Sequence, residues 1–193
     1  HPAVTFDLVR QSGDSAEQAL HTLEADLALI FEPIKSADFQ TMATARQQLY
    51  CMMSANHPLA KKPMIRLRDC VGQPAILPRA DAGLRQLLNV GLIQRSVELG
   101  TVIESNSQEF LQNYLTHEMV ISFQIPIAMP CDLVTTPATD SGVVARPVDL
   151  ADVPAGILHI GQLKGRVLPV AAAKFLDSII TELGARYGDD IDQ

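Results

Sequence analysis

The chain has 193 residues, with 15 Lys and Arg against 22 Asp and Glu, which gives a formal net charge of −7 at pH 7. Hydrophobic residues make up 47% and charged residues 19%. This composition excludes a disordered or low-complexity chain and predicts a buried core in one domain or two small lobes. No run approaches the roughly 20 apolar residues of a membrane span, and the first residues lack a secretion-signal pattern. We therefore expect a soluble, cytoplasmic protein that does not contact membranes.

The acidic balance argues against a chain that binds nucleic acid with its whole surface. The densest basic cluster comprises only Lys61, Lys62, Arg66 and Arg68. Any contact with DNA is therefore expected to lie in a segment outside this sequence.

The three cysteines Cys51, Cys70 and Cys131 are widely spaced and form no C-x-x-C pair. This spacing disfavours a disulfide framework or a structural zinc site. We expect them to be reduced and mostly buried thiols.

In the first part of the chain, alternating apolar and β-branched residues predict a strand over 3–9 and a second over 27–31. Between them, a helical stripe begins after Ser15, which is spaced with Gln18 as a capping box. Short connections favour a parallel strand–helix–strand unit. After a less regular stretch, a further strand is predicted over 49–54.

In the second part, Asp81 is placed to cap a helix that carries Leu84 to Leu92, and Asn106 with Glu109 is spaced as a capping box for the next helix. A long C-terminal helix is predicted to begin near Pro169. The remaining predicted strands, in chain order, are 75–77, 101–104, 119–123, 143–148 and 156–160.

The search for catalytic motifs is negative. The sequence lacks a phosphate-binding loop, a dinucleotide-binding turn and a nucleophile elbow. His117-Glu118 begins a zinc-protease-like string, but Ile121 stands where the second His is required. Cys51 and His57 are the nearest approach to a nucleophile–base pair, and no third group orients them. We expect no enzyme activity, no metal site and no cofactor.

Several strings, taken in their order and spacing, resemble the effector-binding domain of LysR-type transcriptional regulators. The strings are His57-Pro58-Leu59-Ala60, Leu67-Arg68-Asp69-Cys70-Val71-Gly72-Gln73-Pro74-Ala75-Ile76, Gly83-Leu84-Arg85, Glu104-Ser105-Asn106-Ser107 and Ala171-Ala172-Ala173-Lys174-Phe175-Leu176. The resemblance covers nearly the whole chain. One departure is Glu118-Met119-Val120-Ile121, where the family usually has Gly-Leu-Gly-Ile.

The start of the chain resembles the point at which the family enters its second strand. The winged helix–turn–helix domain, the linker helix and the first strand–helix of the effector domain are therefore expected to lie outside this sequence. In the family, that first strand–helix normally contributes to both the effector site and the dimer contact.

The resemblance implies an α/β, two-lobed fold similar to type 2 periplasmic binding proteins, with two chain crossings. Lobe one would comprise residues 1–59 and 155–193, and lobe two residues 60–154. The function implied is the sensing of a small-molecule effector between the lobes to control transcription, in a homodimer or homotetramer that binds DNA through its other domain. The alternative is a transport solute-binding protein of the same fold.

Ligands of open α/β sheets bind beyond the carboxyl ends of strands at a switch point, and the family places its effector there too. The predicted effector-binding residues are Phe31, Glu32, Ser54, Pro78, Arg79, Ser105, Asn106, Ser107, Phe123 and Gln124. If Arg79 and the helix start after Asn106 face the cleft, an anionic effector such as a small carboxylate is favoured. Glu32 would oppose this preference.

Overall fold

The computed structural model describes residues 4–129, 142–187 and 191–192. The chain divides into two compact units, the first formed by residues 1–46 with 157–193 and the second by residues 47–156. The chain therefore passes from one unit to the other twice, as the type 2 periplasmic binding protein fold requires. Each unit contains one β-sheet with helices packed on it.

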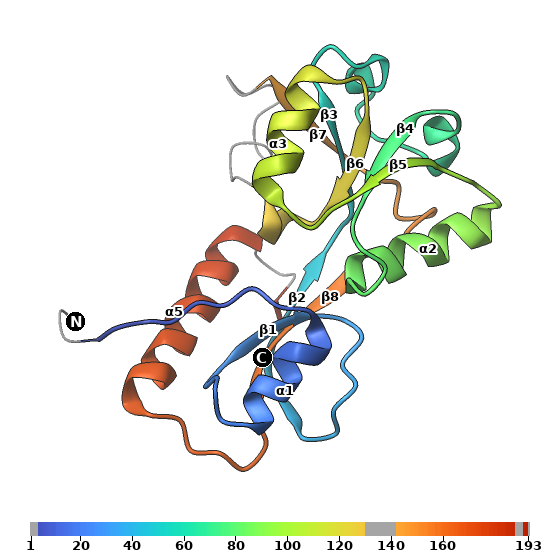
Figure 1. Ribbon diagram of the computed structural model, residues 1–193. Helices are drawn as coiled ribbons and strands as arrows, with labels where there is room; N and C mark the ends of the chain where they lie inside the picture. The colour runs from blue at the N-terminus through green and yellow to red at the C-terminus, as the bar shows by residue number, and fades with distance from the viewer. Residues whose placement is uncertain (1–3, 130–141, 188–190, 193) are drawn as a thin grey trace. The chain divides into compact units, whose positions relative to one another are not determined.

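The first unit is built on a four-stranded sheet with the order β1-β8-β2-β9. The strands are β1 (Ala28–Phe31), β8 (Gly156–Leu163), β2 (Phe39–Gln47) and β9 (Ile191–Asp192). β1 runs antiparallel to β8, and β9 antiparallel to β2. Helix α1 (Gly13–His21) covers one face, where Leu20 packs on Ala28 and Ile30 (Figure 1).

The predicted strand over 3–9 is wrong for its described part, because residues 4–12 form neither helix nor strand. The predicted parallel strand–helix–strand unit is wrong with it, since β1 pairs with β8 in the antiparallel sense. The segment instead crosses α5 (Val170–Tyr187), where the rings of Phe6 and Phe175 lie 4.7 Å apart (Figure 1). Alternating β-branched residues favour extended backbone, but a strand also needs a partner for its hydrogen bonds.

Two further expectations in this unit are corrected. Helix α1 begins earlier than predicted, because the Ser12 hydroxyl caps it and accepts a hydrogen bond from the Ser15 amide. The nine-residue strand β2 was not predicted, since its sequence is rich in Gln, Thr and Ala and lacks alternating large apolar residues. The C-terminal helix begins at Val170, one residue after Pro169, as predicted.

The second unit contains a five-stranded sheet with the order β5-β4-β6-β3-β7. The strands are β3 (Tyr50–Ser54), β4 (Pro74–Leu77), β5 (Gly100–Glu104), β6 (Ile121–Gln124) and β7 (Val143–Pro147). β4 is parallel to β5 and β6, whereas β3 is antiparallel to β6 and β7. Residues 47–59 were expected in the first lobe, but β3 lies inside the sheet of the second unit.

Helix α3 (Gln108–His117) packs on one face of this sheet through Leu111 and Leu115, which join Met52 and Ile76 in a buried cluster. The opposite face is covered by α2 (Gly83–Arg95) and two short 3-10 turns, η1 (Pro58–Lys61) and η2 (Leu67–Cys70). Figure 1 shows α2 and α3 on either side of the strands. A third short turn, η3 (Pro126–Ala128), follows β6.

The start of α2 differs from the prediction. Its N-cap is Ala82, which makes no side-chain hydrogen bond to the helix. Asp81, the predicted cap, lies 3.8 Å from the guanidinium of Arg79 instead.

Candidate functional site

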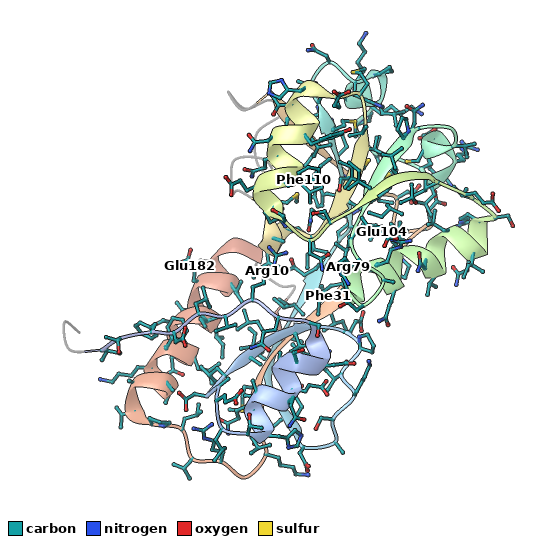
Figure 2. The ribbon with its side chains drawn as sticks, viewed as in Figure 1. Arg10, Phe31, Arg79, Glu104, Phe110 and Glu182 are labelled. Atoms are coloured by element: carbon teal, nitrogen blue, oxygen red, sulfur yellow. The ribbon has the colours of Figure 1, made fainter. Side chains whose placement is uncertain are left out.

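The carboxyl ends of β4, β5 and β6 lie at one edge of the five-stranded sheet, because β4 is parallel to both neighbours. We call this edge the carboxyl edge. The structure brings seven of the predicted site residues to it: Pro78, Arg79, Ser105, Asn106, Ser107, Phe123 and Gln124. Figure 2 shows Arg79 and Glu104 at this end of the sheet, below Phe110 on α3. The part of these residues in ligand binding stays a prediction.

Two loops meet at the carboxyl edge. The backbone N–H of Arg79, after β4, donates to the side-chain Oδ1 of Asn106, after β5, at 3.0 Å. The Ser105 amide donates to the Leu77 carbonyl at 3.0 Å and continues the pairing of the two strands. Because Oδ1 of Asn106 is occupied, the amide NH2 of this side chain remains as the group that can meet a ligand.

Helix α3 begins at the carboxyl edge with its first amides directed outward. Its N-cap is Ser107, whose hydroxyl accepts from the Phe110 amide at 3.3 Å, so the predicted capping box of Asn106 and Glu109 is wrong. The Ser107 amide in turn donates to the Ser105 hydroxyl oxygen at 3.1 Å. Both hydroxyls therefore accept backbone hydrogen bonds and keep their O–H groups as donors.

The charged side chains at the carboxyl edge differ in how completely they are paired. Arg85 of α2, only 15% exposed, donates to the Pro78 carbonyl at 2.8 Å and to Glu104 at 2.9 Å. Glu104 is thereby paired with a cation. The side chain of Arg79 is 68% exposed, and its one ion pair with a described residue is to the 58% exposed Asp81 at 3.8 Å, so Arg79 is the more available cation. Sequence reasoning missed Arg85, because its acceptors belong to two other segments of the chain.

Ser54 does not belong to the carboxyl edge. β3 runs antiparallel to β6 and pairs Tyr50 with Gln124, so the end of β3 at Ser54 lies at the opposite edge of the sheet. There the Ser54 hydroxyl, in a residue only 5% exposed, accepts from the Asn56 amide at 3.3 Å. Among the strands of this sheet that the prediction used, only the parallel strands β4, β5 and β6 bring their carboxyl ends to one edge.

Phe123 is at the correct end of β6 but faces the core. Its side chain has 0% exposure and lies opposite Cys51, on the face covered by η2. Alternation along the strand places its neighbour Gln124 on the other face, toward α3. Phe123 therefore supports the site through packing and presents no free surface to a ligand.

Phe31 and Glu32 lie in the first unit, at the end of β1. Glu32 and Ile157 exchange two hydrogen bonds of 3.0 Å, one from each backbone amide, to the Ile157 carbonyl and to the Glu32 carboxylate. His159 lies two residues after Ile157 on β8, and its Nδ1 is 3.3 Å from the hydroxyl of Thr41 on β2. Burial lowers the pKa of His159, and the charge of Glu32 partly opposes this shift. His159 is a polar group that sequence reasoning did not assign to this region.

A shallow surface hollow also lies in the first unit, lined by Glu17, Leu20, His21, Ser36, Asp38, Phe39 and Leu163. It contains none of the predicted site residues.

The cysteine expectation is confirmed for the two described cysteines. Cys51 and Cys70 are buried, free thiols in mutual contact, and burial raises the pKa of Cys51 well above its usual value. A high pKa leaves little thiolate, which disfavours Cys51 as a nucleophile. Cys131 lies outside the described residues. Within the described ranges, no group of three or more His, Cys, Asp or Glu side chains could hold a metal ion.

Among the residues that the structure describes, no helix combines the length and the apolar character needed to cross a membrane.

Comparison with known families assigns the chain. Residues 1–184 match the model of the LysR substrate binding domain. The chain therefore belongs to the LysR substrate-binding domain family, and the resemblance found in the sequence is confirmed. The fold expected from that resemblance, similar to type 2 periplasmic binding proteins, is confirmed with it.

Solved structures show the same fold at low sequence identity. The Synechocystis PCC6803 CcmR regulatory domain, solved with 2-PG, has a TM-score of 0.77 and 19% identity, covering 98% of this chain and 86% of its own. HinK, a LysR family transcriptional regulator from Pseudomonas aeruginosa, has a TM-score of 0.74 and 21% identity, covering 96% of this chain and 62% of its own. The effector binding domain of QuiR, solved with shikimate, has a TM-score of 0.70 and 18% identity, covering 92% of this chain and 78% of its own.

Proposed function

We propose that this chain is the ligand-sensing domain of a LysR-type transcriptional regulator and that its effector is a small anionic molecule, such as a carboxylate, bound at the carboxyl edge of the second unit. One observation carries the anionic preference. Hydrogen-bond donors gather at the carboxyl edge, on Arg79, Asn106, Ser105, Ser107 and the first amides of α3, while the neighbouring carboxylate of Glu104 is paired with Arg85.

Donors of this kind bind anions for two physical reasons. A guanidinium makes charge-assisted hydrogen bonds to carboxylates, which are stronger than neutral ones. The first turn of a helix adds unpaired N–H groups and the positive end of the helix dipole. Shikimate, the ligand of the QuiR structure, is itself a small carboxylate, which supports this class of effector.

The regulatory step is a change of equilibrium rather than a reaction. An effector shifts the protein toward one arrangement only if it binds that arrangement more tightly than the others. In our proposal the shift is passed to a DNA-binding domain outside this chain, in a cytoplasmic homodimer or homotetramer. The domain catalyses no reaction.

A thermal-shift screen with small carboxylates, neutral analogues and cationic analogues tests the proposal. We expect at least one carboxylate to raise the melting temperature in a concentration-dependent manner. The double variant Arg79→Ala, Asn106→Ala should lose this response, whereas Ser54→Ala, at the opposite edge, should keep it. Binding confined to neutral or cationic compounds would contradict an anionic effector.

A further inference from the structure

Beside the carboxyl edge, a set of buried neutral side chains has hydrogen-bonding groups without partners. Ser122 is 1% exposed, and its hydroxyl has no hydrogen-bond partner among the described residues. The buried Nε2 of Gln108, the first residue of α3, is also without a partner there. Gln124 is 5% exposed, and no hydrogen bond joins its side-chain amide to another described residue.

These side chains lie on the side of the five-stranded sheet that α3 covers. Ser122 pairs directly with Met52, and Gln124 with Tyr50. Directly opposed residues of antiparallel strands project from the same face, and Met52 and Tyr50 pack in the cluster that contains Leu111 of α3. Ser122 and Gln124 therefore lie on the α3 side of the sheet.

Gln108 reaches the same side from the helix. It stands three residues before Leu111 and seven before Leu115, so the three share one helical stripe. Leu111 and Leu115 are buried against the sheet. The amide of Gln108, in the first turn, is therefore directed toward the sheet near the end of β6, where Gln124 lies. We call Tyr50, Gln108, Ser122 and Gln124 the neutral strip.

Unpaired buried polar groups cost stability, because the hydrogen bonds that they make to water in the unfolded chain are lost. Folded proteins pair the great majority of such groups. Two such groups, on Ser122 and Gln108, lie next to an edge rich in anion-binding donors and indicate groups that a bound molecule completes. An apolar ligand would leave them unpaired.

The chemistry of the neutral strip defines what it can bind. It contains amide and hydroxyl groups that both donate and accept hydrogen bonds, and no carboxylate or cationic side chain. Burial raises the pKa of Tyr50, which keeps its phenol neutral at physiological pH. Hydroxyl groups of a ligand, which also donate and accept, match this set more completely than a carbonyl or an ammonium group.

We propose that the neutral strip binds hydroxyl groups of the effector while Arg79 and Asn106 bind its anionic group, so that the effector is a hydroxylated carboxylate. This inference rests on the proposed function of the domain. It adds Tyr50, Gln108 and Ser122 to the residues that determine specificity.

Matched pairs of carboxylates, with and without hydroxyl groups, test the inference by calorimetry on this chain. Suitable pairs are shikimate with cyclohex-1-ene-1-carboxylate, gluconate with hexanoate, and glycerate with propanoate. We expect the hydroxylated member of at least one pair to bind at least about tenfold more tightly, because a site built for hydroxyls leaves its own polar groups unpaired with the other member.

Variants of the strip should remove this preference without harming the free protein. In Gln124→Met and Tyr50→Phe, we expect the two members of the pair to bind within about threefold of each other, because the hydroxyl groups of the hydroxylated member lose their partners. The melting temperature of Ser122→Ala without ligand should be equal to or higher than that of the parent, because no hydrogen bond is lost. Gln94→Met, at an exposed position in the last turn of α2, is the matched control and should change neither quantity.

The outcomes separate this inference from the proposed function. Equal binding of both members, abolished by Arg79→Ala, would overturn the hydroxyl preference and leave the anion-sensing function intact. A preference that persists in Gln124→Met and Tyr50→Phe would also overturn the role of the strip. Failure of every carboxylate to bind would overturn both proposals.

Discussion

The backbone amide of Arg79 and the side-chain oxygen of Asn106 are joined by a hydrogen bond of 3.0 Å. This bond connects the loop after β4 with the turn after β5, 27 residues further along the chain. Asn106 therefore holds the backbone of the most available cation at the carboxyl edge, and it can present its own amide donors to a ligand.

Two substitutions of Asn106 should separate these roles. Asn106→Ala removes the acceptor and should lower the free energy of unfolding by about 1 kcal/mol. Asn106→Asp keeps an acceptor for the Arg79 amide, so its stability should stay close to that of the parent, but its negative charge should weaken the binding of a carboxylate. Urea unfolding and calorimetry measure the two effects, and equal losses of stability in both variants would contradict the division of roles.

Arg79 should act mainly through its charge. We expect Arg79→Gln to weaken the binding of a carboxylate effector by about tenfold at low salt, and by less at high salt, since salt screens exposed charges. Arg79→Lys keeps the charge but loses the planar fork of donors and should give an intermediate affinity. Titrations at two salt concentrations measure the difference, and an affinity of Arg79→Gln that matches the parent would exclude this contact.

Asp152 should make the second unit sensitive to acid. Its carboxylate, 3% exposed, accepts hydrogen bonds from Arg66 and from the Leu67 amide and forms an ion pair with Arg95 at 2.9 Å. Burial alone would raise the pKa of Asp152. The hydrogen bonds from Arg66 and Leu67, together with the charge of Arg95, outweigh burial and hold this pKa below its ordinary value. We expect Asp152→Asn to cost about 2 kcal/mol at neutral pH.

The sign of the pH dependence follows from that lowered pKa. The stabilisation from Asp152 is present above the unfolded pKa of about 3.9 and is lost as the pH falls through the lower pKa of the folded state. The difference between the parent and Asp152→Asn should therefore shrink below about pH 4. Urea midpoints measured from neutral pH downward would contradict this account if the difference were constant.

Gly91 of α2 is required for close packing. A Cβ at this position would lie 2.6 Å from the side chain of Val153 and 2.7 Å from the carbonyl oxygen of Asp152. Gly91→Ala should therefore destabilise the protein by about 1–3 kcal/mol. Gly184 of α5 has no atom within 4 Å of the corresponding position, and Gly184→Ala should stabilise by up to about 1 kcal/mol. Thermal unfolding of both variants provides the comparison.

The helices of this protein were predictable because each has an apolar stripe with helical spacing. The stripe that contains Leu84 and Leu88 became α2, and the stripe that contains Leu111 and Leu115 became α3. Local side-chain chemistry determined the caps less clearly, since neighbouring Ser and Asn residues compete for the same amides. Ser107 rather than Asn106 caps α3 for this reason.

The direction and pairing of strands were harder to predict. The sequence around β3 indicates a strand but contains no information on whether it runs with or against its neighbours. The position of Ser54 depends entirely on that direction, and the antiparallel pairing of β3 with β6 removes it from the site. Residues 4–9 alternate like a strand, yet Phe6 packs on α5 instead of joining a ladder.

The face of the sheet on which each side chain of the site lies could not be predicted from the sequence either. Phe123 and Gln124 both end β6, but only Gln124 lies on the α3 side. Arg85 was overlooked because its role depends on reaching Glu104, 19 residues away, and the carbonyl of Pro78. Only the fold brings those acceptors together.

Chemical-shift mapping tests the central claim most directly. The backbone amides of this chain would be followed by nuclear magnetic resonance during titration with the tightest-binding carboxylate. In the second unit, our account predicts that the largest shifts fall at Arg79, Asn106 and Ser107. Shifts concentrated around Ser54, at the opposite edge of the sheet, or around the hollow beside His21 would contradict a ligand site at the carboxyl edge.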